Sequence, residues 1–426
     1  MTALLTDLYQ ISMMQGYYLA GKHQNLATFE LTFRKGYGNQ AWLIFAGLES
    51  VLQFIKKLRF TEEDIRYLSN MGFDSSFLRA LEDFKFTGDI FSLPEGTVFF
   101  PREPALIVQA PLWEAQYLET MIVNFIGFQT LVATKAKHYR FAARDKQLIE
   151  MGLRRGHGFN TEMSRAARIG GFDYTSNVEA GRLYSIPTVG TMAHSWVMSF
   201  QEETEAFISF ANHGRPPISL LLDTYSTLDS GLPHALKVIT NREGISSIRL
   251  DSGNLLELSK TVREELDYLG DEGQHVKIIV SGDLTPDSIA TLEAQNAPID
   301  MYGVGSALAT LHPFPIHTAV YKLCQIIDSR TGQIRKICKK SDSPAKTTLP
   351  GRKTLVRDYD TKKDTIVPVL PTYNHTSPQD PFIVAIKQGQ TTQFLPTMTE
   401  KARQRLQDTN ELVFSPDWKV EIDSSI

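Results

Sequence analysis

The chain has 426 residues, of which 42% are hydrophobic and 22% are charged, and its formal net charge is −4. This length predicts two domains, and this composition is typical of a globular enzyme. The slightly acidic balance argues against a nucleic-acid partner, and the presence of only two cysteines excludes a disulfide scaffold and a four-cysteine zinc site.

The amino-terminal segment and the cysteine count predict a cytoplasmic location. No basic segment precedes a long apolar run at the amino terminus, so we expect no signal peptide. We also find no apolar run that is long enough to span a bilayer, so no membrane partner is expected. The two cysteines, Cys324 and Cys338, fit a reducing compartment.

The first 111 residues mix a helical pattern with short strand-like pieces. A helix is expected over residues 5–21, and strands are expected over residues 27–34 and 96–101. From about residue 320 the chain is rich in Thr, Pro, Lys and Asp, with short strands such as "FIVAI". The two flanks are either two extra domains or, more economically, one α/β layer built from both ends.

The middle of the chain alternates between strands and helices. Several strands are continuously apolar, which is typical of strands covered on both faces; they are expected over residues 148–152, 188–191, 218–223, 246–251, 275–281 and 299–304. Helices are expected over residues 195–213, 255–270 and 285–296. Gly270 suits a helix C-cap, and Thr285 followed by Pro286 suits a helix start.

This alternation predicts parallel β/α units and therefore an α/β fold. Six or more such units favour an irregular TIM-like β/α barrel over residues 112–319, beside an additional α/β domain formed by residues 1–111 and completed by residues 320–426. A doubly wound open sheet remains an alternative, but no glycine-rich dinucleotide fingerprint favours it.

Polar residues or glycines follow each predicted strand. Because the C-terminal ends of barrel strands form the active face, these residues are expected to lie together; they are Arg154, Arg155, Thr191, His194, Asp223, Arg249, Asp251, Gly282, Asp283, Gly303, Gly305 and Ser306. Each one alone is better explained as a structural residue, a helix cap or a turn. Unrelated structural residues would not all be expected on the same face of the barrel, so these residues together predict a functional site.

The chemistry that these residues suit is phosphate and ribose handling. The "GVGS" segment at residues 303–306 leaves backbone N–H groups open and adds a hydroxyl, as phosphate binding requires. Carboxylates such as Asp251 and Asp283 suit ribose hydroxyls or a magnesium ion, and arginines bind carboxylates or phosphates in a bidentate manner.

Ordered motifs extend over about three quarters of the chain. They include "LLTDLYQISMMQGYY", "NFIGFQTLVATKAKHYRFA", "EMGLRRGHG", "YTSNVEAG", "GTMAHSWVMSF", "LLLDTYSTLDSG", "IRLDSGN", "VSGDLTPD" and "YGVGSALAT". In this order they resemble the motifs of the nicotinate phosphoribosyltransferase family. The resemblance implies an irregular β/α barrel beside an α/β domain built from both chain ends, which agrees with the pattern of elements.

The resemblance also implies a reaction. Nicotinate and phosphoribosyl pyrophosphate give nicotinate mononucleotide and pyrophosphate, with ATP as co-substrate and Mg²⁺ as cofactor, in NAD biosynthesis. It further implies a homodimer with shared active sites. His194 in "GTMAHS" matches the family's phosphohistidine, and imidazole suits this work because it is nucleophilic near neutral pH. Asp223 is expected to orient its ring.

The remaining roles are assigned by the matching motifs. For nicotinate, the resemblance implies contacts from Tyr9 (lent by the partner subunit), Met151, Arg154, Ser176, Thr191 and Arg249. For phosphoribosyl pyrophosphate, it implies Asp251, Gly282, Asp283, Gly303, Gly305 and Ser306, with Asp251 and Asp283 as magnesium candidates.

Three positions depart from the family pattern. Met151 replaces an aromatic residue, Asn254 replaces a common Asp, and Tyr174 replaces a usual glycine. Two alternatives remain: a nicotinamide phosphoribosyltransferase, and a barrel that binds without catalysis. The nicotinamide enzymes tend to carry Asp where this chain has Ser176, so Ser176 favours the acid. The joint presence of His194, Arg249 and Asp251 favours catalysis.

Overall fold

The computed structural model describes residues 2–158, 161–242, 244–342, 346–370, 373, 375, 380–392 and 398–426. The chain divides into two compact units. Unit 1 is formed by the residues up to 131 and from 316 onward, and unit 2 by residues 132–315. The division falls inside helix α6 (Glu119–Ala143). No described helix is both long and apolar enough to cross a membrane.

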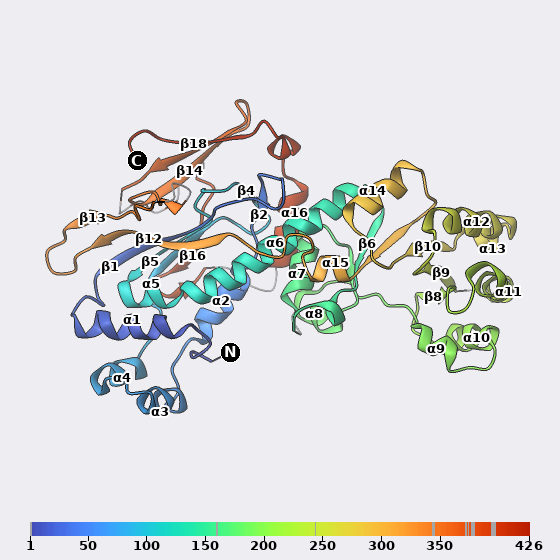
Figure 1. Cartoon of the computed structure of the whole chain (residues 1–426), viewed down its shortest axis with the longest axis horizontal. Helices are drawn as coiled ribbons and strands as arrows, with labels where there is room; N and C mark the ends of the chain where they lie inside the picture. Colours follow the sequence, from blue (N-terminus) through green and yellow to red (C-terminus); the bar gives the residue numbers. More distant parts are fainter. Residues whose placement is uncertain are drawn as a thin grey trace. The chain divides into compact units, whose positions relative to one another are not determined.

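Unit 1 is built on an antiparallel sheet to which both ends of the chain contribute (Figure 1). Its strand order is β13-β12-β1-β5-β3-β16-β17. The strands are β1 (Leu26–Phe33), β3 (Asp89–Ser92), β5 (Leu106–Pro111), β12 (Ala319–Ile327), β13 (Ile334–Lys336), β16 (Ile383–Lys387) and β17 (Gln390–Thr391). The strands predicted at 27–34 and in "FIVAI" are confirmed as β1 and β16.

Smaller sheets and several helices complete unit 1. The pair β2 (Leu43–Ile44) and β4 (Val98–Phe99) forms a two-stranded ribbon, and β14 (Lys353–Asp358), β15 (Lys363–Pro368) and β18 (Lys419–Ile422) form a three-stranded sheet. The helices are α1 (Leu8–Leu19), α2 (Leu48–Lys57), α3 (Glu62–Asn70), α4 (Ser75–Glu82), α5 (Leu112–Tyr117) and α16 (Met398–Gln407), with a 3₁₀ turn η5 (Glu411–Phe414). Helix α5 packs against β1 and β5 (Figure 1).

Unit 2 contains a parallel sheet in the order β7-β6-β11-β10-β9-β8. The strands are β6 (Gln147–Glu150), β7 (Tyr174–Thr175), β8 (Ile218–Leu221), β9 (Ile245–Leu250), β10 (Lys277–Val280) and β11 (Met301–Val304). In the part of the chain that the structure describes, β7 and β8 end the sheet without pairing with each other. The fold is therefore mixed α/β, with a curled parallel half-barrel.

Helices connect the strands of this parallel sheet. They are α7 (Glu162–Gly170), α8 (Val178–Tyr184), α9 (His194–Met198), α10 (Glu203–His213), α11 (Leu232–Asn241), α12 (Leu255–Tyr268), α13 (Asp271–Gln274), α14 (Pro286–Ala294) and α15 (Ser306–Ala309), with short turns η1 (Leu153–Arg155) and η2 (Thr227–Gly231). Helix α12 packs against β9 and β10 (Figure 1).

Two of the predicted helices are confirmed with their end signals. Helix α14 begins at Pro286, and Thr285 caps it: its hydroxyl accepts from the N–H of Ser288, and the Ser288 hydroxyl accepts from the N–H of Thr285. Helix α12 ends at Tyr268, and Gly270 follows in the left-handed region at φ +65°.

The single helix predicted over residues 195–213 is wrong, because two helices occupy this segment. Helix α9 ends at Met198 and α10 begins at Glu203. The Ser199 hydroxyl donates to the Trp196 carbonyl oxygen at 2.6 Å, and this side-chain bond competes with continuation of the helix. The Trp196 indole N–H donates to the Ala206 carbonyl oxygen at 3.0 Å, which ties α9 to α10.

The strand predicted over residues 188–191 is also wrong. Only one isolated parallel bridge forms there, between Thr175 and Thr188. Pro187 precedes the segment and has no N–H, and Gly190 disfavours a regular strand, so pairing stops after one residue. The pairing that the prediction missed is made by the two-residue strand β7.

The core of unit 2 reaches the carboxyl ends of the sheet strands. Buried Ile149, Ile279 and Met301 form a cluster, against which the partly buried Met151 and Val189 pack. This apolar layer supports the polar residues that follow the strands.

Candidate functional site

The register of the parallel sheet brings the predicted polar residues to one edge. Arg249 of β9 pairs with Ile279 of β10, and Glu150 of β6 pairs with Val304 of β11. The residues that follow these four strands therefore emerge side by side at their carboxyl ends.

A cavity of about 80 Å³ lies at this edge of unit 2. Ten residues predicted from the sequence line it: Met151, Arg154, Arg155, Arg249, Asp251, Gly282, Asp283, Gly303, Gly305 and Ser306. Ser281 completes the lining. The volume is smaller than the roughly 300–1,000 Å³ of common ligand pockets, so the cavity by itself holds only part of a large substrate pair.

Arg249 is fixed by three hydrogen bonds. Its Nε donates to Ser281 Oγ at 2.7 Å, its Nη1 to Thr191 Oγ1 at 2.8 Å, and its Nη2 to Asp251 Oδ1 at 2.6 Å. Ser281 Oγ in turn donates to Asp251 Oδ1. Because a guanidinium has five N–H donors, two remain for a ligand.

The carboxyl group of Asp251 is held in its ionised form. Burial opposes ionisation, but the Ser281 hydroxyl and the Arg249 guanidinium outweigh burial and lower the pKa of Asp251 below its ordinary value. A negative charge thus lies beside the cation that faces the cavity.

Glycines allow close packing around the cavity. A Cβ atom on Gly303 would lie 2.9 Å from Met151 Sδ and 3.2 Å from Ser281 Cβ. Gly282 has φ +112°, and a Cβ there would lie 2.8 Å from the Asp251 carbonyl oxygen. Gly282 is therefore required for space and for its backbone conformation, whereas a side chain at Gly303 would displace the Met151 thioether from the cavity.

His194 and Asp223 form a pair in unit 2. His194 Nε2 lies 3.2 Å from Asp223 Oδ1, and the second carboxylate oxygen accepts a hydrogen bond of 2.5 Å from the Ser252 hydroxyl. The Asp223 side chain is 4% exposed and the His194 side chain is 40% exposed. A buried carboxylate thus orients an accessible imidazole at the first residue of α9.

The other predicted residues have distinct places. Thr191 reaches the cavity network through Arg249, and the backbone N–H of Ser176 donates to the Glu150 carbonyl oxygen at 2.8 Å. Tyr9 belongs to α1 of unit 1, where it is 47% exposed. Burial and the nearby Glu119 carboxylate raise the pKa of Tyr9 to about 12.

Sequence reasoning missed three polar residues in this region: Ser281, Ser252 and Glu150. Ser281 ends a predicted strand, so its position was available, but an isolated serine gives no indication of its partners. Ser252 lies within the quoted "LDSG" segment, and Glu150 lies inside the predicted strand 148–152.

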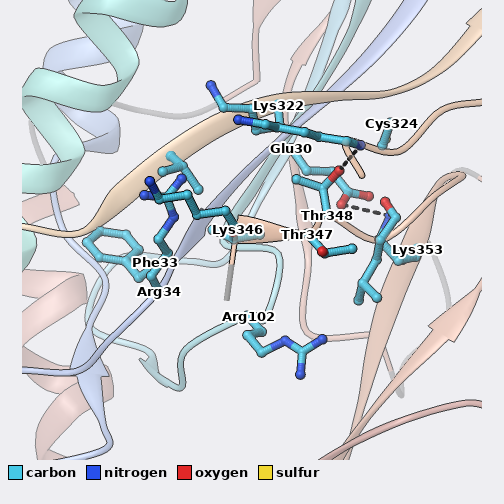
Figure 2. A pocket seen from close by; sticks show the side chains of 14 residues that line it. Glu30, Phe33, Arg34, Arg102, Lys322, Cys324, Lys346, Thr347, Thr348 and Lys353 are labelled. Carbon is cyan, nitrogen blue, oxygen red and sulfur yellow. Dashed lines mark hydrogen bonds and ion pairs between the residues drawn. The ribbon is translucent and has the colours of Figure 1, made fainter. Parts of the chain in front are cut away.

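A second and larger cavity of about 440 Å³ lies in unit 1 (Figure 2). Basic side chains are frequent in its lining, among them Arg34, Arg102 and Lys346. At one side Lys353 Nζ lies 2.9 Å from Glu30 Oε2, in a nearly buried ion pair. Most of the residues predicted for the substrates line the smaller cavity, so that cavity is the candidate site.

The residues that could hold a metal are few. Within the described residues, no group of three or more His, Cys, Asp and Glu side chains is arranged as a metal site. Asp251 and Asp283 both line the cavity. Because Mg²⁺ is usually bound by one or two carboxylates together with substrate phosphates, this pair fits such an ion.

Comparison with known proteins gives a consistent result. Residues 4–127 match the model of the nicotinate phosphoribosyltransferase (NAPRTase) N-terminal domain, and residues 146–370 match that of the nicotinate phosphoribosyltransferase (NAPRTase) family. The chain is 41% identical over 361 residues to nicotinate phosphoribosyltransferase of Bacillus subtilis, an alignment that covers 83% of this chain and 73% of the relative.

Two further proteins are similar over most of the chain. A nicotinate phosphoribosyltransferase of Mycobacterium tuberculosis is 41% identical over 83% of this chain and 75% of its own length. The crystal structure of human nicotinic acid phosphoribosyltransferase superimposes with a TM-score of 0.83 at 26% identity, covering 99% of this chain and 98% of the human one.

Proposed function

We propose that this chain, which belongs to the nicotinate phosphoribosyltransferase family, couples its reaction to ATP through a phosphohistidine at His194. The activity itself follows from the family: the chain is a nicotinate phosphoribosyltransferase of NAD biosynthesis. Nicotinate and phosphoribosyl pyrophosphate are its substrates, and nicotinate mononucleotide and pyrophosphate are its products. The observation that carries the assignment of the site is the cavity lined by ten of the predicted residues.

The geometry of His194 supports its role as the phosphorylated residue. With the Nε2 proton directed to Asp223 Oδ1, the Nδ1 lone pair is the nucleophile toward the γ-phosphoryl group of ATP. The N–P bond forms as the bond to the ADP oxygen breaks. The Ser252 hydroxyl holds the Asp223 carboxylate in place through its other oxygen.

Nicotinate binding is proposed for the Arg249 side of the cavity. The two remaining guanidinium N–H groups of Arg249 suit the nicotinate carboxylate, and Arg154 supplies a second cation. Met151 lies against Gly303 and offers its thioether to the pyridine ring in place of an aromatic side chain. Ser176 adds no carboxylate of its own beside that of the substrate.

The phosphoribosyl group is proposed to occupy the side formed by Gly303, Gly305 and Ser306, whose backbone N–H groups and hydroxyl suit a 5′-phosphate. Asp251, Gly282 and Asp283 suit the ribose and pyrophosphate. When bound, Mg²⁺ would neutralise part of the pyrophosphate charge, and Asp251 and Asp283 are the residues that would hold it. Arg249 and Asp251 position the two substrates for attack by the pyridine nitrogen.

We also propose that the active site is shared across a homodimer, with Tyr9 lent by the partner subunit to stack on the pyridine ring. Its exposure of 47% on α1 and the small volume of the unit 2 cavity support this arrangement. A two-fold dimer would then carry two identical composite sites.

Subunit complementation tests this sharing. Tyr9→Ala protein is mixed with Arg249→Ala protein under conditions that exchange subunits. In a shared arrangement the heterodimer has one intact and one doubly damaged site, so activity should recover toward roughly a quarter of wild type by random pairing. No recovery despite proven exchange would rule out lending of Tyr9.

The proposal also includes the barrel, the additional domain and the cellular location. The half-barrel is completed as an irregular TIM-like barrel that forms the catalytic domain, predicted over residues 112–319, although residues 112–131 and 316–319 belong to compact unit 1. Residues 1–111 and 320–426 form an additional α/β domain, which the sheet shared by β1 and β12 supports. A cytoplasmic location rests on the presence of only two cysteines.

The decisive experiment is turnover of nicotinate and of nicotinamide, each with and without ATP. We expect preferential turnover of nicotinate and stimulation by ATP. Equal use of nicotinamide would refute the assignment of the acid substrate, and turnover unaffected by ATP would refute the coupling.

A further inference from the structure

We propose that Glu150 is a positioning residue that holds the segments 151–155 and 174–177 at a fixed spacing. The inference rests on the proposed function, because these segments carry Arg154 and Ser176, which are proposed to face nicotinate. Glu150 itself does not line the cavity and touches the substrate only through these segments.

The carboxylate of Glu150 is fully buried at the end of β6. It accepts hydrogen bonds from three groups on three different segments. The donors are the backbone N–H of Gly152, the Ser164 hydroxyl at 2.8 Å and the Thr175 hydroxyl at 2.5 Å. One side chain therefore joins the 151–155 turn, helix α7 and strand β7.

The donors and acceptors of this network are matched only if position 150 carries a carboxylate, whose two oxygens both accept. Asn177 Nδ2 donates to the Ser164 hydroxyl at 3.1 Å, and the Asn177 backbone N–H donates to the Thr175 hydroxyl at 3.0 Å. Each hydroxyl has one proton, and both protons go to the same oxygen, Glu150 Oε2. An amide at this position would turn an N–H₂ group either toward these donors or toward the Gly152 N–H.

The backbone adds a second connection between the two segments. The Glu150 carbonyl oxygen accepts from the N–H of Ser176 at 2.8 Å. On the other side, a Cβ on Gly152 would lie 2.9 Å from Ala309 Cβ and 3.2 Å from the Gly305 carbonyl oxygen, so the turn packs closely against the segment that contains Gly305 and Ala309. A shift of the carboxylate therefore displaces Arg154 relative to Ser176.

The effect on the reaction follows from positioning. Misplacing a substrate by about 1 Å costs on the order of 100-fold in rate, even when the altered residue is remote from the reacting atoms. His194 and Asp223 have their own hydrogen bonds, which do not include this network. Loss of the carboxylate should therefore affect nicotinate use and spare phosphorylation of His194.

The test compares Glu150→Gln with Ser164→Ala and Thr175→Val, each of which removes one donor and keeps the carboxylate. For each protein, the KM and kcat for nicotinate, the ratio of nicotinate to nicotinamide turnover, and the rate of phosphohistidine formation from ATP are measured. We expect Glu150→Gln to raise the nicotinate KM at least tenfold and lower the acid-to-amide ratio. The two single-donor variants should show smaller changes in the same direction, with phosphohistidine formation unchanged.

Several outcomes would overturn the inference. An unchanged nicotinate KM in a folded Glu150→Gln protein would do so, as would a parallel loss of phosphohistidine formation in a Glu150→Gln protein that is folded. If Glu150→Gln does not fold, unchanged kinetics in both single-donor variants would be equally decisive. A wild-type protein that forms phosphohistidine but does not convert nicotinate refutes the proposed function instead, and the positioning role falls with it.

Discussion

Removal of the Ser281 hydroxyl tests how the Arg249 network controls nicotinate binding. In Ser281→Ala, Arg249 Nε loses its acceptor at 2.7 Å, and Asp251 Oδ1 loses one of its two donors. The bonds from Nη1 to Thr191 and from Nη2 to Asp251 remain. The guanidinium is then held by two hydrogen bonds instead of three, so its position is less tightly fixed.

The magnitude follows from the lost interaction. Ser281 is 3% exposed, so water does not readily replace the hydroxyl. A hydrogen bond to a charged group contributes about 1.5–3 kcal/mol, and each 1.4 kcal/mol corresponds to a factor of ten. We therefore expect kcat/KM for nicotinate to fall by roughly 10- to 100-fold.

The same variant shifts the pH dependence in a defined direction. Burial opposes ionisation of Asp251, and Ser281 and Arg249 together hold its pKa below the ordinary value. Without the hydroxyl the pKa rises, so the carboxylate becomes protonated at higher pH. The acid limb of the kcat/KM profile should move to higher pH.

Steady-state kinetics at saturating phosphoribosyl pyrophosphate and ATP measure both effects. Ser259→Ala is the matched control, because this buried serine of α12 donates only to the Leu256 carbonyl oxygen at 3.0 Å, away from the cavity. If Ser281→Ala retains wild-type kcat/KM and the wild-type acid limb, Arg249 is positioned without this hydroxyl and the reasoning is refuted.

Three further outcomes are expected. His194→Ala should abolish the acid-labile phosphoenzyme formed from ATP, because the proposed nucleophile is absent, and labelling at the wild-type rate would contradict the assignment. Ser176→Asp should weaken nicotinate more than nicotinamide by about 1 kcal/mol or more, because two carboxylates then repel each other; equal KM changes for both substrates would remove Ser176 from the specificity argument. Burial of Glu114 outweighs its hydrogen bonds from Thr87 and raises its pKa to about 7. Because the folded protein holds the Glu114 proton more tightly than the unfolded chain, this group stabilises the fold fully below pH 4.5. The free energy of unfolding then falls by about 3 kcal/mol as the pH rises through 7. Thermal unfolding between pH 5 and 8 should show a decline that is smaller in Glu114→Gln, and identical slopes would exclude Glu114 as its source.

The parallel sheet and its polar edge could be predicted from the sequence because both depend on local patterns. Apolar runs located β6, β8, β9, β10 and β11, and the residues immediately after β6, β9, β10 and β11 line one cavity. The break between α9 and α10 could not be predicted, because it depends on the bond from Trp196 to Ala206, ten residues away. The apolar periodicity of the segment continues through the break.

The side chains that position the site residues could not be predicted from the sequence either. The sequence shows that Glu150 lies in a strand, but its three donors come from positions 152, 164 and 175, and only the fold brings these together. Arg249 was identified by its motif, whereas the hydroxyl that accepts from its Nε comes from another strand. Residues proposed to contact the substrates can be recognised by local motifs, whereas the residues that position those side chains can be recognised only in the tertiary structure.

The sheet of unit 1 has a consequence for the order in which the chain can fold during synthesis. Unit 2 is continuous, so all of its residues have left the ribosome once residue 315 emerges. Strand β1, by contrast, pairs with β12, and residues Leu26 and Ile327 are neighbours in that ladder. The edge of β1 that β12 will cover therefore stays open while about 300 residues are added, so unit 1 begins first and is completed last.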